Sequence, residues 1–135
     1  MLAIVPMFHV NAWGIPYAAP MVGAKLVFPG PGLDGASLYE LMEAERVEST
    51  SAVPTVWMNL VNYMKQNKLR FSTLKSSTIG GAACPPALME TLEKDFGVRV
   101  CHGWGMTEMS PVGTINATPA GIRLENCACD VRRSA

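Results

Sequence analysis

Strand-like and helix-like segments alternate along this chain, and the alternation restricts its fold more than any other feature. Five short segments are strand candidates: residues 2–5, 24–28, 47–53, 76–81 and 98–101. Four segments between them are helix candidates: residues 15–22, 37–46, the stretch opening at Pro54 and the stretch opening at Pro85 and Pro86 and ending at Gly97. This order predicts right-handed β-α-β connections and an α/β fold with a mainly parallel sheet.

The segment "PGPGLDG", 29–35, spells G-x-G-x-x-G after a strand candidate. That pattern is typical of dinucleotide-binding turns. Pro29 and Pro31, however, remove backbone N–H groups that a pyrophosphate would need. The next helix is predicted to begin only after the third glycine, where Ser37 and Glu40 would form a capping box. We therefore interpret the segment as a tight connection.

Composition favours one globular domain. Of the 135 residues, 49% are hydrophobic and 16% are charged, which indicates a buried core and argues against disorder. Lys and Arg together number 11, as do Asp and Glu, so no basic excess predicts binding to nucleic acid. The first 24 residues carry no charge, but prolines and polar residues interrupt them. We expect no signal peptide or transmembrane segment, and a cytoplasmic protein.

Three loops should meet at one edge of the predicted sheet: "PMFHVNAWG", "GGAACPP" and "HGWGMTEMSP". Each follows a strand candidate, and ligands of parallel sheets bind beyond the carboxyl ends of the strands. The glycines in these loops permit close approach of the backbone to a ligand. The last loop, 102–111, is expected to form neither helix nor strand.

That last loop holds a group for each component of a nucleotide–metal complex. Glu108 could ligate Mg²⁺, Thr107 could bond a phosphate oxygen, and Trp104 offers a flat face to a nucleobase. The alternative is that Thr107 and Glu108 cap a helix and that Trp104 belongs to the core.

The three loops, in this order, resemble the AMP-forming adenylating superfamily of acyl-CoA synthetases, luciferases and adenylation domains. "WGMTE" is similar to its Y-G-x-T-E signature, "GGAAC" to the small-residue turn before it, and "PMFHVNAWG" to its P-x-F-H motif. With "GAKLVFPGPGLD" and "VPTVW", the sequence looks most like the medium- and long-chain fatty acyl-CoA synthetases. The similarity covers residues 2–116.

The resemblance implies a reaction and its ligands. A fatty acid carboxylate would attack the α-phosphate of ATP to give acyl-adenylate and pyrophosphate, and the CoA thiol would then displace AMP. Glu108 would hold Mg²⁺ and Thr107 would contact the phosphate. Trp104 stands where the family usually has tyrosine and would stack on adenine.

The same resemblance assigns the small residues of two loops. Gly81, Ala82 and Ala83 would line the adenine and acyl pocket with backbone and small side chains. Gly103 and Gly105 would let their loop pass close to the nucleotide.

His9 and Trp13 carry the acyl end of the implied site. His9 would lie near the acyl carboxylate, and Trp13 stands where fatty-acyl members place a tryptophan that gates the acyl tunnel. The alternative for each is a place in the core. His102 is interpreted as structural.

The four cysteines are Cys84, Cys101, Cys127 and Cys129. We expect reduced and mostly buried thiols, because no secretory signal supports disulfides. The last two, with His102, would offer zinc three ligands instead of the usual four, which argues against a zinc site.

Several parts of the family pattern have no counterpart in this sequence. These are the phosphate-binding loop ending in P-K-G, the T-G-D aspartate and the C-terminal domain with its catalytic lysine. We therefore expect residues 1–116 to be part of an AMP-binding domain, residues 117–135 to be a divergent, poorly ordered tail, and the isolated chain to be inactive.

Two alternatives to this function stay open. One is a non-catalytic product that binds nucleotide weakly or associates with a full-length synthetase. The other is part of an aryl- or amino-acid-activating enzyme.

Overall fold

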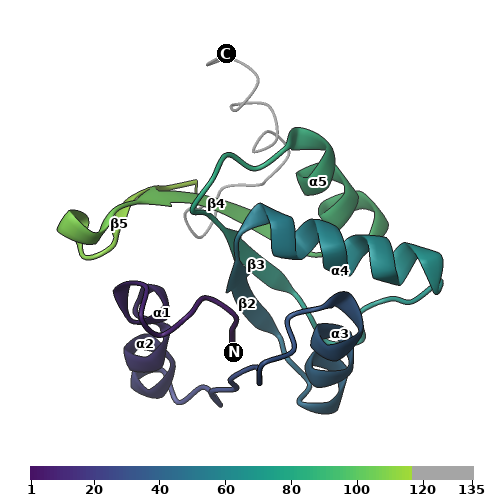
Figure 1. Ribbon diagram of the computed structural model, residues 1–135, viewed down its shortest axis with the longest axis horizontal. Coiled ribbons are helices and arrows are strands. Elements are labelled where there is room, and N and C mark those ends of the chain that lie inside the picture. Colours follow the sequence, from purple (N-terminus) through teal and green to yellow (C-terminus); the bar gives the residue numbers. More distant parts are fainter. Residues whose placement is uncertain (117–135) are drawn as a thin grey trace.

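A five-stranded sheet organises the chain, as the computed structural model in Figure 1 shows. The structure describes residues 1–116. The strands lie side by side in chain order: β1 (Leu2–Ala3), β2 (Ser49–Ala52), β3 (Ser76–Ile79), β4 (Arg99–Gly105) and β5 (Val112–Ile115). The first three pairings are parallel and the pairing of β4 with β5 is antiparallel. The prediction of an α/β fold with a mainly parallel sheet is confirmed.

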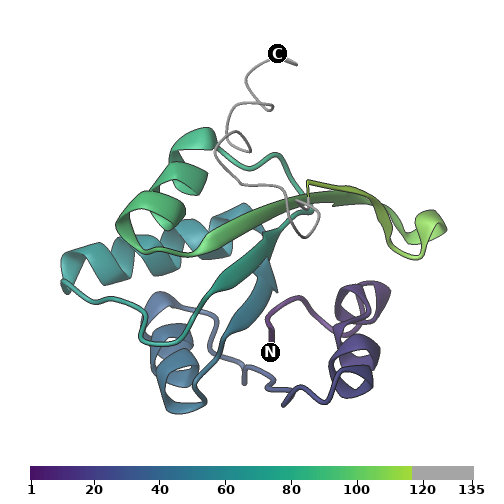
Figure 2. The same cartoon turned by 180° about the vertical axis from the view of Figure 1, so that it is seen from behind.

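The helices cover the sheet from two sides (Figures 1 and 2). They are α1 (Val10–Trp13), α2 (Ile15–Met21), α3 (Gly35–Ala44), α4 (Pro54–Gln66) and α5 (Pro86–Glu90). A π-helical turn, Thr91–Asp95, continues α5.

Successive residues at the start of the chain are buried on opposite faces of the sheet. Leu2 and Ile4 belong to the large core formed with α3, α4 and α5. Ala3 and Val5 belong to a smaller cluster that includes Ile15 of α2. Because side chains alternate along a strand, this short segment anchors both layers of helices.

The predicted strand 24–28 is reduced to a single bridge. Val27 pairs with Leu2 in parallel, and its N–H and carbonyl groups bond to Met1 and Ala3 at 2.9 and 3.0 Å. The prolines and glycines that follow in 29–35 end the pairing, since proline lacks the N–H that a ladder needs.

The predicted start of α3 at Ser37 is wrong. The helix begins at Gly35, and the Asp34 carboxylate caps it by accepting from the N–H groups of Ala36 and Ser37 at 3.1 and 3.0 Å. Asp34 is itself a preferred N-cap residue, and it lies directly before Gly35, three positions ahead of Ser37. The Ser37 hydroxyl donates to Asp34 at 2.7 Å instead of capping.

Gly35 is required by packing between helices. A Cβ added there would lie 2.5 Å from Cβ of Tyr63 on α4. The third glycine of "PGPGLDG" thus lets α3 approach α4, which explains the pattern without any nucleotide.

The predicted loop 102–111 is also partly strand. β4 continues through "HGWG" to Gly105, a three-residue 3-10 turn (Thr107–Met109) follows, and β5 returns beside β4. Local propensity is overridden here because both neighbours, β3 and β5, satisfy the backbone hydrogen bonds of β4. The hairpin extends beyond the other strands in Figures 1 and 2.

Four helices end in the same way. After α2, α3, α4 and the π-helical turn, one residue adopts a positive φ: Gly23 (68°), Arg46 (51°), Lys68 (54°) and Gly97 (68°). After α3, the N–H of Val47 bonds to the Met42 carbonyl at 2.9 Å, and that of Arg46 bonds to the Glu43 carbonyl at 3.2 Å. This is the Schellman arrangement, which glycine adopts without strain and side-chain-bearing residues do not.

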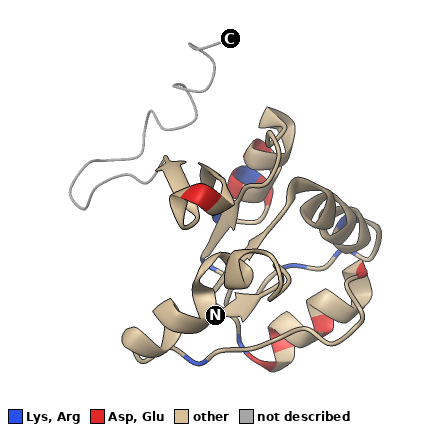
Figure 3. Ribbon diagram, turned by 60° about the vertical axis from the view of Figure 1, so that its left-hand side comes forward, with Lys and Arg blue, Asp and Glu red and all other residues tan. Residues whose placement is uncertain are grey.

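The described part of the chain shows neither a concentrated basic surface nor a helix suited to a membrane. Lys and Arg are distributed over several elements in Figure 3, and no broad basic face forms in residues 1–116. No helix in this part of the chain has the length and apolar character needed to cross a membrane.

We expect Arg46→Gly to stabilise the chain and Gly97→Ala to destabilise it, each by about 1 kcal/mol, because a left-handed position favours glycine by that amount. The free energy of unfolding in urea measures both. Arg46→Ala, which removes the same charge but keeps a side chain at the left-handed position, is the control. An Arg46→Gly variant no more stable than the parent chain would contradict the expectation.

Stability should also depend on acid through Asp34. The Ser37 hydroxyl, followed by the Ser37 N–H, lowers the pKa of the Asp34 carboxyl below its ordinary value. A folded pKa below the unfolded one means that the stabilisation is present at neutral pH and is lost as pH falls through the folded pKa. Asp34→Asn keeps a capping oxygen without this titration.

Melting temperatures of the two chains between pH 7 and pH 2 should therefore converge in acid. A constant difference between them would rule out the titration of Asp34 as its source.

Candidate functional site

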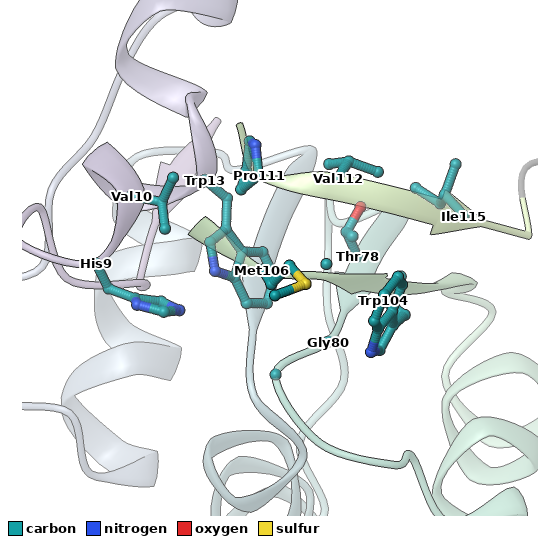
Figure 4. A pocket seen from close by; sticks show the side chains of 13 residues that line it. His9, Val10, Trp13, Thr78, Gly80, Trp104, Met106, Pro111, Val112 and Ile115 are labelled. Carbon is teal, nitrogen blue, oxygen red and sulfur yellow. The ribbon is translucent and has the colours of Figure 1, made fainter. Parts of the chain in front are cut away.

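A cavity of about 80 Å³ lies where the parallel strands end. Three segments far apart in the sequence meet there, as Figure 4 shows. The lining residues are His9, Val10, Trp13, Thr78, Gly80, Gly81, Gly103, Trp104, Gly105, Met106, Pro111, Val112 and Ile115. The three predicted loops therefore do contribute to one cavity.

The first wall comes from a left-handed turn. Val10, Asn11, Ala12 and Trp13 all have φ between 46° and 54°, so the element labelled α1 is not a right-handed helix. Each such residue costs about 1–2 kcal/mol relative to the right-handed conformation. Burial of Ala12 beside Ile15 and Val5 offsets part of this cost.

The left-handed turn brings two predicted residues to the cavity. His9 and Trp13 both line it, and Figure 4 shows their side chains projecting from the same side of the site. The sequence contains no glycine between Phe8 and Trp13, so nothing in it predicted positive φ angles in this segment. Strain of this kind is often retained at functional sites, which makes the turn a candidate for one.

Two glycines form the floor beneath Trp13. A Cβ on Gly80 would lie 3.2 Å from the Cη2 atom of Trp13, and a Cβ on Gly81 would lie 3.7 Å from its Cζ2 atom. The Gly80 position is closed further by the carbonyl oxygen of Gly103, at 2.7 Å from the same hypothetical atom. A methyl on Gly80 would press on the indole, so the absence of a side chain there lets Trp13 rest against the end of β3. At Gly81 the distance to the indole is an ordinary contact, and the φ of 79° is what favours glycine.

The second wall comes from the hairpin. Trp104 and Met106 lie on or just beyond β4, and Val112 and Ile115 lie on β5. Trp104 is 55% exposed, so one face of its indole is free to contact a ligand.

Thr107 and Glu108 do not line the cavity. Both are exposed on the 3-10 turn at the tip of the hairpin. Their interpretation as helix caps is wrong, because the capping position is Met106 and no side chain there makes a capping hydrogen bond. Within residues 1–116 neither side chain has a hydrogen-bond partner that would commit it to a structural role.

Ala82 and Ala83 also lie outside the cavity lining, exposed in the loop after β3. The Ala82 carbonyl is 3.3 Å from Nε2 of His102, which ties this loop to β4. The N–H of His102 donates to the Asn116 side chain. These contacts support a structural role for His102.

Cys84 is a core thiol. It is 8% exposed, and burial raises its pKa to about 11, so little thiolate forms at neutral pH. Cys101 is also a free thiol and is half-buried. The other two cysteines, and any zinc site involving them, fall outside the described residues.

Sequence reasoning missed several lining residues: Val10, Thr78, Gly80, Met106, Pro111, Val112 and Ile115. The alternation along β3 could have indicated Thr78, since it faces away from the core that holds Ser77 and Ile79. Val112 and Ile115 had no such signal, because their place depends on the hairpin.

The cavity can hold only part of a ligand. Sites for drug-sized molecules usually measure ~300–1,000 Å³, several times this volume. Its walls are mainly two indoles and apolar side chains; the polar side-chain groups among the described lining residues are those of His9 and Thr78 and the indole N–H groups. Such a site suits an apolar or planar portion of a larger molecule.

Comparison with known proteins gives these features a context. Residues 1–131 match the family described as AMP-binding enzyme. Over 116 residues the chain is 51% identical to a medium-chain-fatty-acid–CoA ligase of Ectopseudomonas oleovorans, covering 86% of this chain and 21% of that protein. Over 112 residues it is 52% identical to a long-chain-fatty-acid–CoA ligase of Thermus thermophilus, covering 83% and 20%.

A solved structure has the same arrangement of elements. The N-terminal domain of FACL13 from Mycobacterium tuberculosis superposes with a TM-score of 0.77 at 26% identity, over 94% of this chain and 30% of that one. The chain spans about a fifth of the length of the two ligases above.

The two glycines of β4 should respond differently to a methyl group. On Gly105 a Cβ would lie 2.0 Å from the Pro111 carbonyl oxygen, whereas on Gly103 its nearest neighbours would be 3.8 Å away. We expect Gly105→Ala to open the hairpin and Gly103→Ala to leave it intact. Hydrogen exchange of the Met106 amide, which bonds to Pro111 at 2.9 Å, reports the difference. Equal protection in both variants would contradict it.

Proposed function

Because the chain belongs to the family of AMP-binding enzymes, we propose that it forms the part of a fatty acid–CoA ligase that contacts the acyl-adenylate. In the proposed reaction a fatty acid carboxylate attacks the α-phosphorus of ATP and pyrophosphate leaves. The CoA sulfur then attacks the acyl carbon, and AMP leaves. The names of the two ligases to which the chain is 51% and 52% identical support a fatty acid as substrate.

The observation that carries this proposal is the meeting of Trp13, the Gly80–Gly81 floor and Trp104 around one cavity. An acyl-adenylate has an apolar chain at one end and a planar base at the other. Aliphatic residues and Trp13 suit the first part, and the exposed indole of Trp104 suits stacking of the second. We assign Gly81, Ala82 and Ala83 to the path of the ligand between them, and Gly103 and Gly105 to close backbone approach.

Glu108 and Thr107 are assigned to the phosphates. No three His, Cys, Asp or Glu side chains gather at a metal site within residues 1–116. A single exposed carboxylate fits Mg²⁺ only in its usual nucleotide setting, where phosphate oxygens and water supply the other ligands. Bound there, the ion would neutralise phosphate charge, and the Thr107 hydroxyl would donate to a phosphate oxygen.

His9 is assigned to the acyl carboxylate. It lines the same cavity as Trp13, and its side chain is exposed, so it can donate a hydrogen bond to an incoming carboxylate. It would orient the nucleophilic oxygen rather than exchange a proton, because a carboxylate needs no base to attack.

A second candidate function rests on exposed apolar side chains near α1 and α2. Phe8, Met21 and Val22 are 92%, 85% and 76% exposed. Apolar surface of this kind favours contact with another polypeptide. The chain would then act as a non-catalytic partner, for instance of a full-length synthetase.

The catalytic test uses the purified 135-residue chain with ATP, Mg²⁺, a fatty acid and CoA. We expect no pyrophosphate, because residues 1–116 contribute no Lys or Arg to the cavity lining that could position and neutralise phosphates. Pyrophosphate release above the level of a Glu108→Gln variant would overturn this expectation and establish turnover by the chain alone.

The binding test uses calorimetry with a non-hydrolysable acyl-adenylate analogue. Trp104→Ala should weaken binding about tenfold, within the range for loss of one base–aromatic stack. Tyr17→Ala, which removes a 62% exposed aromatic residue on α2, is the matched control and should leave affinity unchanged. Equal affinity of the Trp104→Ala variant and the parent chain would exclude the stacking role. Binding only to an added synthetase would favour the second candidate.

A further inference from the structure

Trp104 lies against a position of β5 that has no side chain. A Cβ added to Gly113 would lie 2.5 and 2.6 Å from the Cζ3 and Cε3 atoms of Trp104, and 2.9 Å from Sδ of Met109. Real Cβ atoms do not approach other atoms this closely, so any residue other than glycine would force the indole to move.

Gly113 is needed for space and not for its backbone conformation. Its φ lies outside the left-handed region, whereas Gly81 on the opposite side of the cavity has a φ of 79°. A residue with a side chain could therefore adopt the backbone of position 113. The indole, at the two shortest distances, and the sulfur of the flexible Met109 side chain exclude it.

The strand pairing explains how the two residues meet. Trp104 pairs with Thr114, and the next residue, Gly105, pairs with Val112. Gly113 is therefore the extra residue of a bulge between these pairs, with no partner of its own on β4. A bulge bends its strand and redirects side chains near it.

We propose that Gly113 is the positioning residue for Trp104, and that the bulge without a side chain holds the indole as a flat wall of the cavity. The two indole atoms nearest to position 113, Cε3 and Cζ3, belong to the fused benzene ring. A phenylalanine at 104 lacks this outer ring and would leave more room at position 113. The effect of Gly113 on ligand affinity rests on the proposed function. The effect of Gly113 on the position of the Trp104 indole is independent of that function.

The first experiment needs no ligand. The full chain is labelled with 5-fluorotryptophan, and the three ¹⁹F resonances are assigned by replacing Trp13, Trp57 and Trp104 in turn. Gly113→Ala should shift the Trp104 resonance and leave that of Trp57, which is buried on α4, in place. Gly30→Ala is the control, because a methyl there meets nothing within 4 Å. An unmoved Trp104 resonance in the Gly113→Ala chain would overturn the proposal.

A double-mutant cycle separates positioning from general damage to the hairpin. Gly113→Ala should lower the melting temperature of the parent chain but have little effect in a Trp104→Phe background. An equal loss in both backgrounds would mean that position 113 acts independently of Trp104. If Gly113→Ala alone does not fold, the cycle is read from whether Trp104→Phe restores folding. Failure to restore it would also count against the proposal.

Ligand binding then tests the functional consequence. Gly113→Ala should lower the affinity for the acyl-adenylate analogue roughly tenfold, as Trp104→Ala does, whereas Gly30→Ala should leave the affinity unchanged. If no chain binds the analogue, the proposed function fails, and the ¹⁹F spectra and the cycle still decide whether Gly113 positions Trp104.

Discussion

The parallel pairing of β2, β3 and β4 is the constraint on which the site depends. Ala52 pairs with Ile79, and Ile79 with His102, so the strands run level toward the same edge. The residues that follow must then leave the sheet side by side. Gly80 and Gly103 are so close at this edge that a methyl on the first would meet the carbonyl of the second at 2.7 Å. The cavity exists because the backbones of β3 and β4 come close together at this edge and the glycines there have no side chains to fill the space.

The cavity is shaped by space more than by charge. The glycine at 80 makes room for the indole of Trp13, and the glycine at 113 makes room for that of Trp104. Each of these aromatic side chains is accommodated by a residue that contributes backbone atoms and no side chain. A site built in this way presents flat apolar surfaces and backbone groups to a ligand. In the proposed function, the contacts to phosphate and Mg²⁺ are assigned to Thr107 and Glu108, on the 3-10 turn outside the cavity lining.

The wall of the cavity formed by Val10 to Trp13 has the least favourable backbone conformation in the site. The left-handed turn from Val10 to Trp13 holds four residues in an unfavourable conformation, and the burial of Ala12 and Ile15 offsets part of that cost. The alternating burial of the first strand is what brings these two layers together, because Ala3 and Val5 face the turn while Leu2 and Ile4 face the main core. The same chain segment therefore supports both the fold and the site.

The sequence by itself determined the alternation of helices with the parallel strands β1 to β4 and the loops that meet at their edge, but neither the loss of strand 24–28 to a single bridge nor the return strand β5. Hydrophobic spacing and proline positions are local signals, and they predicted α4 at Pro54 and α5 near Pro86 correctly. Local chemistry was a weaker guide to the ends of elements. Two preferred capping residues, Asp34 and Ser37, competed within one turn, and the packing of Gly35 on Tyr63 favoured the earlier start.

The tertiary structure alone decided what lines the cavity. His9, Trp13, Gly81, Gly103, Trp104 and Gly105 lie there as their loops suggested, whereas Ala82, Ala83, Thr107 and Glu108 lie outside it. The roles assigned to all of them stay predictions. The second wall could not be read from local sequence, because "HGWG" becomes a strand only through its partners and Gly113 gains its importance only beneath an indole nine residues away. Contacts between distant residues depend on register, and register is a property of the folded sheet.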